Sequence, residues 1–326
     1  MLLYDNHNTQ PVECQDNREV LTDISASGRE RPWRAKKQQS ELLSALYEDI
    51  DMKKAFRISE CADFLKFALK ADGTKKLKEM RSCRVRLCPM CAWRRSLKVH
   101  HHVVKILDAM CGEYAYIFLT LTVKNCEGDE LSKTLDKLMK AWNRLSKEPL
   151  FLAAVKGWYR GLEVTHNIDE NSESYDTYHP HFHCLLAVRK NYFNGRHYLK
   201  NEDWAWLWKK SLDVDYEPIV DVRKVTGTTS KAVAEAAKYT VKDSDYIVRQ
   251  DLEFSIKTIR ILDAALNKRR LIAFGGVMKE WHRKLNLDDE MDGDLIHVDG
   301  DETNAEETDK EIVFAWHTGY SQYFRK

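Results

Sequence analysis

The chain has 326 residues, of which 43% are hydrophobic and 32% are charged, so it can bury one large core and an accessory unit. It contains no apolar stretch of about 18 residues and no apolar signal-peptide core, which argues against a membrane span and against secretion. The eight cysteines are unevenly spread, so we expect reduced thiols in the cytoplasm and metal binding in preference to disulfides.

The net charge of +1 hides an asymmetry along the chain. Residues 288–311 carry 12 Asp or Glu and one Lys, so the remainder of the chain is strongly basic. A basic body predicts a polyanionic partner. We interpret residues 287–311 as an acidic linker that either screens this body or has no role.

The first part of the chain is expected to be flexible and then helical. Residues 1–38 are polar and lack periodicity, so we expect a flexible N-terminal segment there. From Gln39 to about Leu69, apolar residues recur at helical spacing, which predicts helices. With the cysteine cluster that follows, residues 39–110 are predicted to form a helical, zinc-containing region that binds DNA.

Three cysteines follow one another with the spacing C-x4-C-x2-C, at Cys83, Cys88 and Cys91. Thiolates at this spacing are typical of a tetrahedral Zn²⁺ site, which needs a fourth ligand. We prefer Cys61, because structural zinc sites are usually thiolate-rich and closed. The histidine run at residues 100–102 is the alternative.

Basic residues surround this cluster. Nine Lys or Arg lie between residues 75 and 98, against the single acid Glu79. Such a basic surface is typical of contacts with phosphate, although a merely solvated basic face is the alternative. Four arginines are predicted to bind DNA: Arg84, Arg86, Arg94 and Arg95.

Two strands and a helix are predicted next. Residues 114–123 and 158–165 are rich in β-branched and aromatic residues, as strands are. Between them, residues 129–147 carry apolar side chains at helical spacing. Glu163 lies among apolar neighbours in the second strand, where a carboxylate is costly to bury unless it is paired or binds a metal. A surface acid on an edge strand is the alternative.

The strongest signal is the run HPHFH, which begins at His179 and leads directly into an apolar stretch. Such a run predicts a strand that is buried on both faces, and alternation puts His181 and His183 on the same face. If the preceding strand is its antiparallel neighbour, Glu163 lies beside both histidines. Two imidazoles and a carboxylate with open positions suit Mg²⁺ or Mn²⁺ acting on a phosphate. Packed or surface histidines are the alternative.

The remaining elements are predicted as a Trp-rich helix at Trp204–Leu212, a strand at 219–225, helices at 230–241, 251–268 and 277–286, and a late strand at 312–316 in a C-terminal segment 312–326. In the helix at 230–241, Glu235 and Tyr239 are four residues apart and so share a face. Lys238 and Lys242 flank the tyrosine, although an ordinary solvated helix face has the same composition.

Taken in order, these motifs resemble those of HUH endonucleases, and more closely those of the replication initiators of small Gram-positive rolling-circle plasmids. The resemblance covers roughly residues 56–285 and is carried by the stretches 83–97 (CRVRLCPMCAWRRSL), 116–124 (YIFLTLTVK), 160–166 (RGLEVTH), 179–188 (HPHFHCLLAV) and 235–246 (EAAKYTVKDSDY). It implies an α+β fold in which residues 111–286 form an HUH nickase domain. In that fold a central antiparallel sheet is flanked by helices, with an inserted or N-terminal zinc knuckle and extra helices.

The resemblance also implies the chemistry. His181 and His183 would hold the divalent metal, and Tyr239 would nick the origin through a 5′-phosphotyrosine and leave a 3′-OH primer. Glu235 would act in termination. From the chemistry of the residues themselves, Lys238 or Lys242 is expected to help lower the pKa of the tyrosine. The implied partners are origin DNA that is single-stranded at the nick site, a host helicase and a DNA polymerase in the bacterial cytoplasm. A homodimer is left open.

Three other functions fit parts of the pattern. A related HUH transposase or relaxase would use the same site. A zinc-dependent DNA-binding regulator without nuclease activity would keep the histidines as structural residues. The run HPHFHCL also fits the pattern of histidine-triad nucleotide hydrolases, but those chains are short and end soon after the motif.

Overall fold

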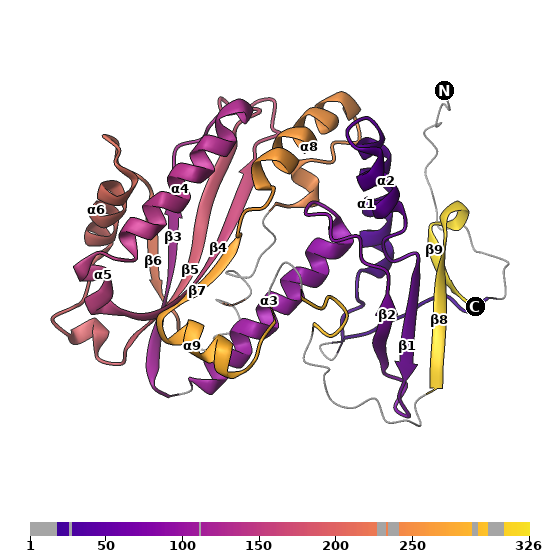
Figure 1. The fold of residues 1–326 in the computed structure, drawn as a ribbon, viewed down its shortest axis with the longest axis horizontal. Coiled ribbons are helices and arrows are strands. Elements are labelled where there is room, and N and C mark those ends of the chain that lie inside the picture. Colours follow the sequence, from indigo (N-terminus) through magenta and orange to yellow (C-terminus); the bar gives the residue numbers. More distant parts are fainter. Residues whose placement is uncertain are drawn as a thin grey trace.

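The computed structural model describes residues 18–25, 28–110, 112–226, 233, 241–288, 293–298 and 310–326. These residues form two antiparallel sheets with helices packed around them (Figure 1). One sheet has the strand order β6-β3-β5-β4-β7, and the other has the order β2-β1-β8-β9. The predicted α+β class, with antiparallel strands flanked by helices, is confirmed.

The strands are β1 (Phe64–Leu69), β2 (Lys75–Met80), β3 (Tyr114–Thr122), β4 (Val155–His166), β5 (Tyr178–Arg189), β6 (Val220–Lys224), β7 (Ile272–Gly275), β8 (Lys310–His317) and β9 (Gln322–Arg325). The helices are α1 (Trp33–Glu48), α2 (Met52–Ser59), α3 (Pro89–Ala109), α4 (Leu131–Leu145), α5 (Pro149–Ala154), α6 (Asn201–Leu212), α8 (Leu252–Leu266) and α9 (Gly276–Lys284), with short 3₁₀ turns at Gly128–Glu130, Tyr192–Asn194, Asp243–Asp245 and Thr318–Tyr320. Within the described residues, no helix combines the length and the apolar character that a membrane crossing requires. The helix predicted over 230–241 lies outside the described residues, apart from Val233 and Val241.

The histidine strand β5 lies at the centre of the five-stranded sheet. Every neighbouring pair in this sheet is antiparallel, and β5 is paired with β3 on one side and β4 on the other. The predicted antiparallel pairing of the glutamate strand with the histidine strand is therefore confirmed. The pairing sets Glu163 directly opposite His181 and Thr120 opposite His183.

Helices cover both faces of this sheet, which explains why β5 is apolar almost throughout (Figure 1). On one face, Phe182 packs edge-on against Trp142 of α4 and Trp208 of α6. On the other face, Leu185 belongs to a cluster with residues of α3 and α9, such as Val103. The histidines of β5 point to the α3 and α9 face, because their odd-numbered positions alternate with that of Phe182.

The four-stranded sheet joins the two ends of the chain. β1 forms a hairpin with β2, and β8 pairs with β1 along its whole length before β9 completes the sheet. The predicted strand at 312–316 is confirmed by β8, and the residues of the predicted C-terminal segment 312–326 supply β8 and β9 to this sheet. The helix expected to reach Leu69 is corrected, because α2 ends at Ser59 and Ala62 adopts a left-handed φ of +52°. After this break the chain enters the sheet.

Among the described residues of the segment 1–38, which was predicted to be flexible, several are buried or helical, so the prediction is wrong for them. Helix α1 already begins at Trp33, whose ring is 2% exposed and packs edge-on against Trp93. The Trp33 indole donates to Asp23 at 2.6 Å. Leu21 is buried as well, and its backbone bonds to Tyr323 of β9. One large aromatic side chain therefore anchors a polar stretch that lacks periodicity.

Gly276 provides a test of the junction between β7 and α9. Its φ is +54°, and a Cβ there would lie 2.2 Å from the carbonyl oxygen of Lys156. Gly73 has a φ of +82°, but a Cβ at that position would meet no atom within 4 Å. We expect Gly276→Ala to lower the free energy of unfolding by several kcal/mol, because backbone strain and a steric clash add.

The matched variant Gly73→Ala carries the backbone strain alone, about 1–2 kcal/mol. Thermal unfolding of both variants and the wild type measures the difference. Equal shifts in Tm for the two variants would contradict the close approach of Gly276 to the backbone of β4.

Candidate metal centres

The histidine strand and its neighbour converge on one point. The Nε2 atoms of His181 and His183 lie 3.2 Å apart, and Nε2 of His183 lies 2.9 Å from Oε2 of Glu163. Nε2 of His181 is 3.5 Å from the same carboxylate oxygen. This arrangement follows from the register, which pairs Glu163 with His181 and leaves the side-chain-free Gly161 opposite His183.

The outer nitrogens of both imidazoles are also engaged. Nδ1 of His181 lies 3.0 Å from the carbonyl oxygen of His179, and a carbonyl only accepts, so this nitrogen carries the proton. Nδ1 of His183 lies 3.3 Å from the hydroxyl of Thr120, and Phe118 stacks on the same ring. Hydrogen bonds of this kind orient metal-binding histidines and leave the Nε2 lone pair free for an ion.

The electrostatics of this group favour a cation. Glu163, His181 and His183 are only 7–8% exposed. Burial alone would raise the pKa of Glu163, but hydrogen bonds from His181 and His183 outweigh it and hold the pKa well below its usual range. Ligand atoms about 3 Å apart match neighbouring positions around an ion whose bonds are about 2.1 Å long. The group can therefore hold a divalent metal and leave other positions open.

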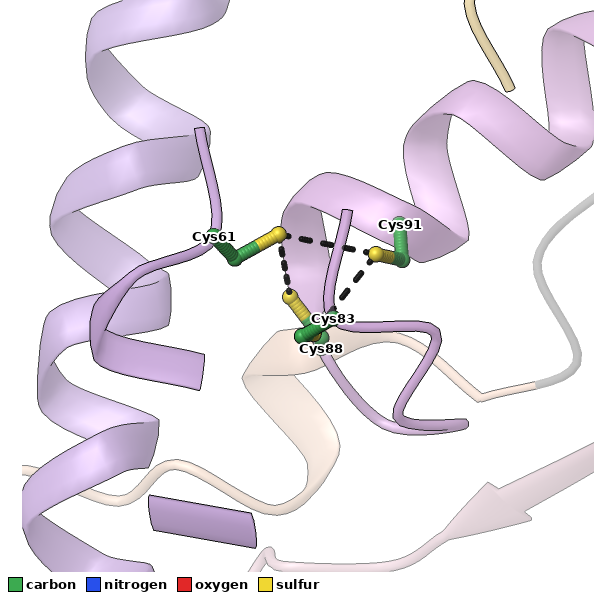
Figure 2. Close-up of side chains that lie close together, drawn as sticks. All are labelled: Cys61, Cys83, Cys88 and Cys91. Carbon is green, nitrogen blue, oxygen red and sulfur yellow. Dashed lines mark hydrogen bonds between the residues drawn. The ribbon is translucent and has the colours of Figure 1, made fainter. Parts of the chain in front are cut away.

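The four predicted cysteines come together in a second cluster (Figure 2). Sγ of Cys61 lies 3.5 Å from that of Cys91 and 3.7 Å from that of Cys88, and Cys83 lies 3.6 Å from Cys91. Disulfide sulfurs would be about 2.05 Å apart. Sulfurs bound to one tetrahedral Zn²⁺ at about 2.3 Å would be about 3.8 Å apart, which is close to the observed spacing.

The structure also identifies the residue that completes the cysteine cluster. Cys61 follows α2, Cys83 and Cys88 lie in the loop before α3, and Cys91 lies in the first turn of α3 (Figure 2). The histidine run 100–102 lies on α3 itself, and its first member is about 14 Å further along the helix axis than Cys91. The run therefore cannot reach the three thiols, whereas Cys61 does.

Two side chains of α1 lie beside the cysteines, and the sequence did not predict them there. The ammonium group of Lys37, 1% exposed, donates to the carbonyl oxygens of Ser59 at 2.6 Å and Cys61 at 2.8 Å. The hydroxyl of Ser40 lies 3.5 Å from Sγ of Cys88. Burial lowers the pKa of Lys37, while the thiols oppose that shift. A Lys in a polar stretch carries no sequence signal for such a position.

Two of the four arginines predicted to bind DNA are buried in this structure, while DNA binding around the cysteines stays a prediction. Arg94 is 1% exposed and donates to the carbonyl oxygens of Leu295 and Ile296. Arg95 is 8% exposed. Arg86 is partly buried and donates to a carbonyl beyond α8, so of the four arginines Arg84 is the exposed one.

Within the predicted acidic linker 287–311, Asp288 and residues 293–298 pack against α3. The carboxylate of Asp288 lies 2.6 Å from the ammonium nitrogen of Lys98 and 3.3 Å from Nε2 of His102. Leu295 and Val298 are buried. These residues therefore have a structural role along α3, since their carbonyl and carboxylate oxygens accept hydrogen bonds from the buried cations Arg94 and Lys98.

The predicted nucleophile Tyr239 and its neighbour Glu235 lie outside the described residues. Lys242 is exposed, and Tyr246, the other tyrosine nearby, is 1% exposed with its hydroxyl donating to the carbonyl oxygen of Leu87 at 2.5 Å. Burial raises the pKa of Asp245, Lys242 opposes this, and the charge of Glu163 adds to it. The roles predicted for Tyr239, Glu235 and Lys242 therefore stay predictions.

The cysteine cluster makes a prediction about stability. Cys88→Ala should release stoichiometric zinc and lower Tm, because binding of a structural metal contributes directly to folding. Cys184→Ala is the matched control, since Cys184 is fully buried in β5 but lies outside the cluster, so it should keep its zinc. Metal analysis and thermal unfolding measure both. Wild-type protein without zinc after purification under reducing conditions would refute the assignment.

Comparison with known proteins agrees with these motifs. The family described as "Replication protein" matches residues 74–324. A "Protein rep" from Bacillus amyloliquefaciens is 39% identical over 336 aligned residues, covering 94% of this chain and 97% of the relative. A "Protein rep" from Streptococcus pneumoniae is 35% identical, covering 96% of this chain and 97% of the relative. No solved structure matches the chain significantly. The chain therefore belongs to the replication-protein (Rep) family, and its resemblance to the initiators of small Gram-positive rolling-circle plasmids is confirmed.

Proposed function

We propose that this Rep protein starts rolling-circle replication by nicking one strand of the plasmid's double-strand origin, with Tyr239 as the nucleophile and Mg²⁺ or Mn²⁺ as the metal. The observation that carries the proposal is the convergence of His181, His183 and Glu163 on one face of the central strand. Two imidazoles and one carboxylate with open positions favour chemistry on a phosphate over a closed structural site. On this proposal, residues 111–286 act as an HUH nickase domain.

The nicking step exchanges one phosphate ester for another. The phenolic oxygen of Tyr239 attacks the scissile phosphorus of single-stranded origin DNA, and the bond from phosphorus to the 3′ oxygen breaks. The 5′ end stays on the protein as a phosphotyrosine, and the proton that the phenol loses is balanced by the one that the 3′ oxygen gains. A bound divalent ion would supply positive charge to the non-bridging oxygens of the phosphate. The free 3′-OH then primes a host polymerase, while a host helicase separates the strands.

One feature of the described residues supports Tyr239 over Tyr246. The hydroxyl of Tyr246 is buried and already donates to a backbone carbonyl, so it is poorly placed to attack a strand of DNA. Lys242 is exposed and lies three residues after Tyr239 in the sequence, and a cation close to a tyrosine favours its phenolate form.

A covalent-adduct assay tests the proposal. The protein is incubated with a labelled single-stranded origin oligonucleotide and Mn²⁺, and a protein–DNA band is sought on a denaturing gel. We expect wild-type protein to form the band and Tyr239→Phe to form none. Glu163→Ala, His181→Ala and His183→Ala should each slow the adduct by about a hundredfold or more, because several kcal/mol of charge stabilisation are lost. Circular dichroism should still report folded protein.

The assay also separates the alternatives. Tyr246→Phe should still yield an adduct, and a result in which only Tyr246→Phe fails would move the nucleophile to Tyr246. DNA binding that persists without an adduct under any divalent metal would favour a zinc-dependent DNA-binding regulator. An adduct on an unrelated donor sequence with equal efficiency would instead favour a transposase.

Glu235 makes a separate prediction about termination. We propose that its carboxylate activates water for the final cut, because a second covalent transfer would start another round. In the helix that the sequence predicts over residues 230–241, a spacing of four residues would set Glu235 within about 6 Å of Tyr239 at the backbone. Glu235→Ala should form the first adduct normally but yield over-length displaced strands, and Glu235→Tyr should convert the cut into strand transfer. Unit-length circles at the normal rate from Glu235→Ala would leave Glu235 as a simple helix-pairing residue.

A further inference from the structure

The loop that carries the zinc-binding cysteines touches the chain just beyond the stretch that contains Tyr239. The hydroxyl of Tyr246 donates to the carbonyl oxygen of Leu87 at 2.5 Å, and the side chain is 1% exposed. This carbonyl belongs to the peptide bond that joins Leu87 to Cys88, one of the four clustered thiols. A metal bound to Cys88 would therefore also fix the position of the Leu87 carbonyl oxygen, which accepts the hydrogen bond from Tyr246.

The same short segment, residues 241–246, is held at other points. The ammonium nitrogen of Lys36 in α1 lies 2.8 Å from a carboxylate oxygen of Asp243. Nδ1 of His166 lies 2.9 Å from the carbonyl oxygen of Asp245, and since a carbonyl only accepts, the imidazole donates. His166 lies at the end of β4, the strand that also carries the metal-binding glutamate. The segment is thus attached both to the cysteine region and to the catalytic strand.

Further side chains link the cysteine region and α1 to α8. Arg86 lies between two of the clustered cysteines in sequence and donates to the carbonyl oxygen of Arg269, between α8 and β7. Tyr47 of α1 donates to Asp263 of α8 at 2.9 Å. These two bonds attach the cysteine region and α1 to α8 and to the loop that follows α8, so they set positions within the protein.

We propose that Tyr246 is a positioning residue for the nicking reaction, through which the zinc knuckle holds the segment 241–246 that directly follows the stretch carrying the nucleophile. The inference rests on the proposed function, in which Tyr239 attacks the phosphate. The chain that leaves Tyr239 reaches buried Val241 two residues later and buried Tyr246 seven residues later. A nucleophile must be held within about 0.5 Å of its productive position, and a shift of about 1 Å costs roughly a hundredfold in rate.

Tyr246→Phe tests this with one atom removed. At saturating oligonucleotide, the rate of adduct formation should fall about tenfold to a hundredfold, while the Kd for the same oligonucleotide stays at the wild-type value. Tyr323→Phe is the matched control. Tyr323 is fully buried and donates to the carbonyl oxygen of Ala62 at 2.6 Å, next to Cys61 on the other side of the cluster. It loses the same kind of bond beside a zinc-binding cysteine but should keep the wild-type rate.

A double-mutant comparison tests the route through the knuckle. If the cluster acts through Tyr246, adding Tyr246→Phe to Cys88→Ala should slow the adduct no further than Cys88→Ala alone, whereas independent effects would multiply. If Cys88→Ala does not fold, the two tyrosine variants decide the question by themselves.

The outcomes distinguish this inference from the proposed function. A wild-type rate for Tyr246→Phe, or equal slowing in Tyr323→Phe, overturns the positioning role while Tyr239 remains the nucleophile. A weakened Kd with an unchanged saturated rate also overturns it, because Tyr246 would then act on DNA binding. An adduct formed by Tyr239→Phe refutes the proposed function itself.

Discussion

The antiparallel register between β4 and β5 is the constraint on which the candidate catalytic centre depends. Backbone hydrogen bonds set Glu163 opposite His181, and the alternation of a strand puts His183 on the same face two residues later. A slip of one residue would turn the carboxylate or both imidazoles toward the opposite face of the sheet. That face is filled by the aromatic side chains of α4 and α6, so a slipped register would bury charges in an apolar layer without partners.

The cluster of four cysteines is not held together by a sheet. Its four thiols come from the end of α2, a loop and the first turn of α3, so a bound ion would tie together elements that share few backbone hydrogen bonds. Lys37 and Ser40 add contacts from α1. The group of Glu163, His181 and His183 is therefore held by a sheet, which is rigid without metal, whereas the cysteine group is held by segments whose relative positions a metal can fix.

Sequence reasoning succeeded where the pattern is local. The alternation in β5 and the residue types at positions 163, 181 and 183 were sufficient to predict both the strand pairing and the side chains that meet. Where the outcome depends on distant residues, it failed. Strand β1 (FLKFAL) pairs with β8, which lies some 240 residues later in the sequence, and the local pattern of β1 does not predict which strand it pairs with. Arg94 illustrates the same limit. Its charge suggested an exposed side chain, but its guanidinium donates hydrogen bonds to two carbonyl oxygens that lie some 200 residues away in the sequence.

The pairing of β1 with β8 has a consequence for the order in which the protein is made. Strand β1 is synthesised early, but its neighbour begins at Lys310, so the four-stranded sheet cannot close until β8 and β9 have been synthesised. Contacts between such distant segments form slowly, and domains tend to fold as their residues emerge. The five-stranded sheet is complete by Gly275 and can therefore assemble first. A product that is broken off before these last strands would carry a complete five-stranded sheet beside a β1 edge without its partner, and an open edge of this kind can pair with other chains.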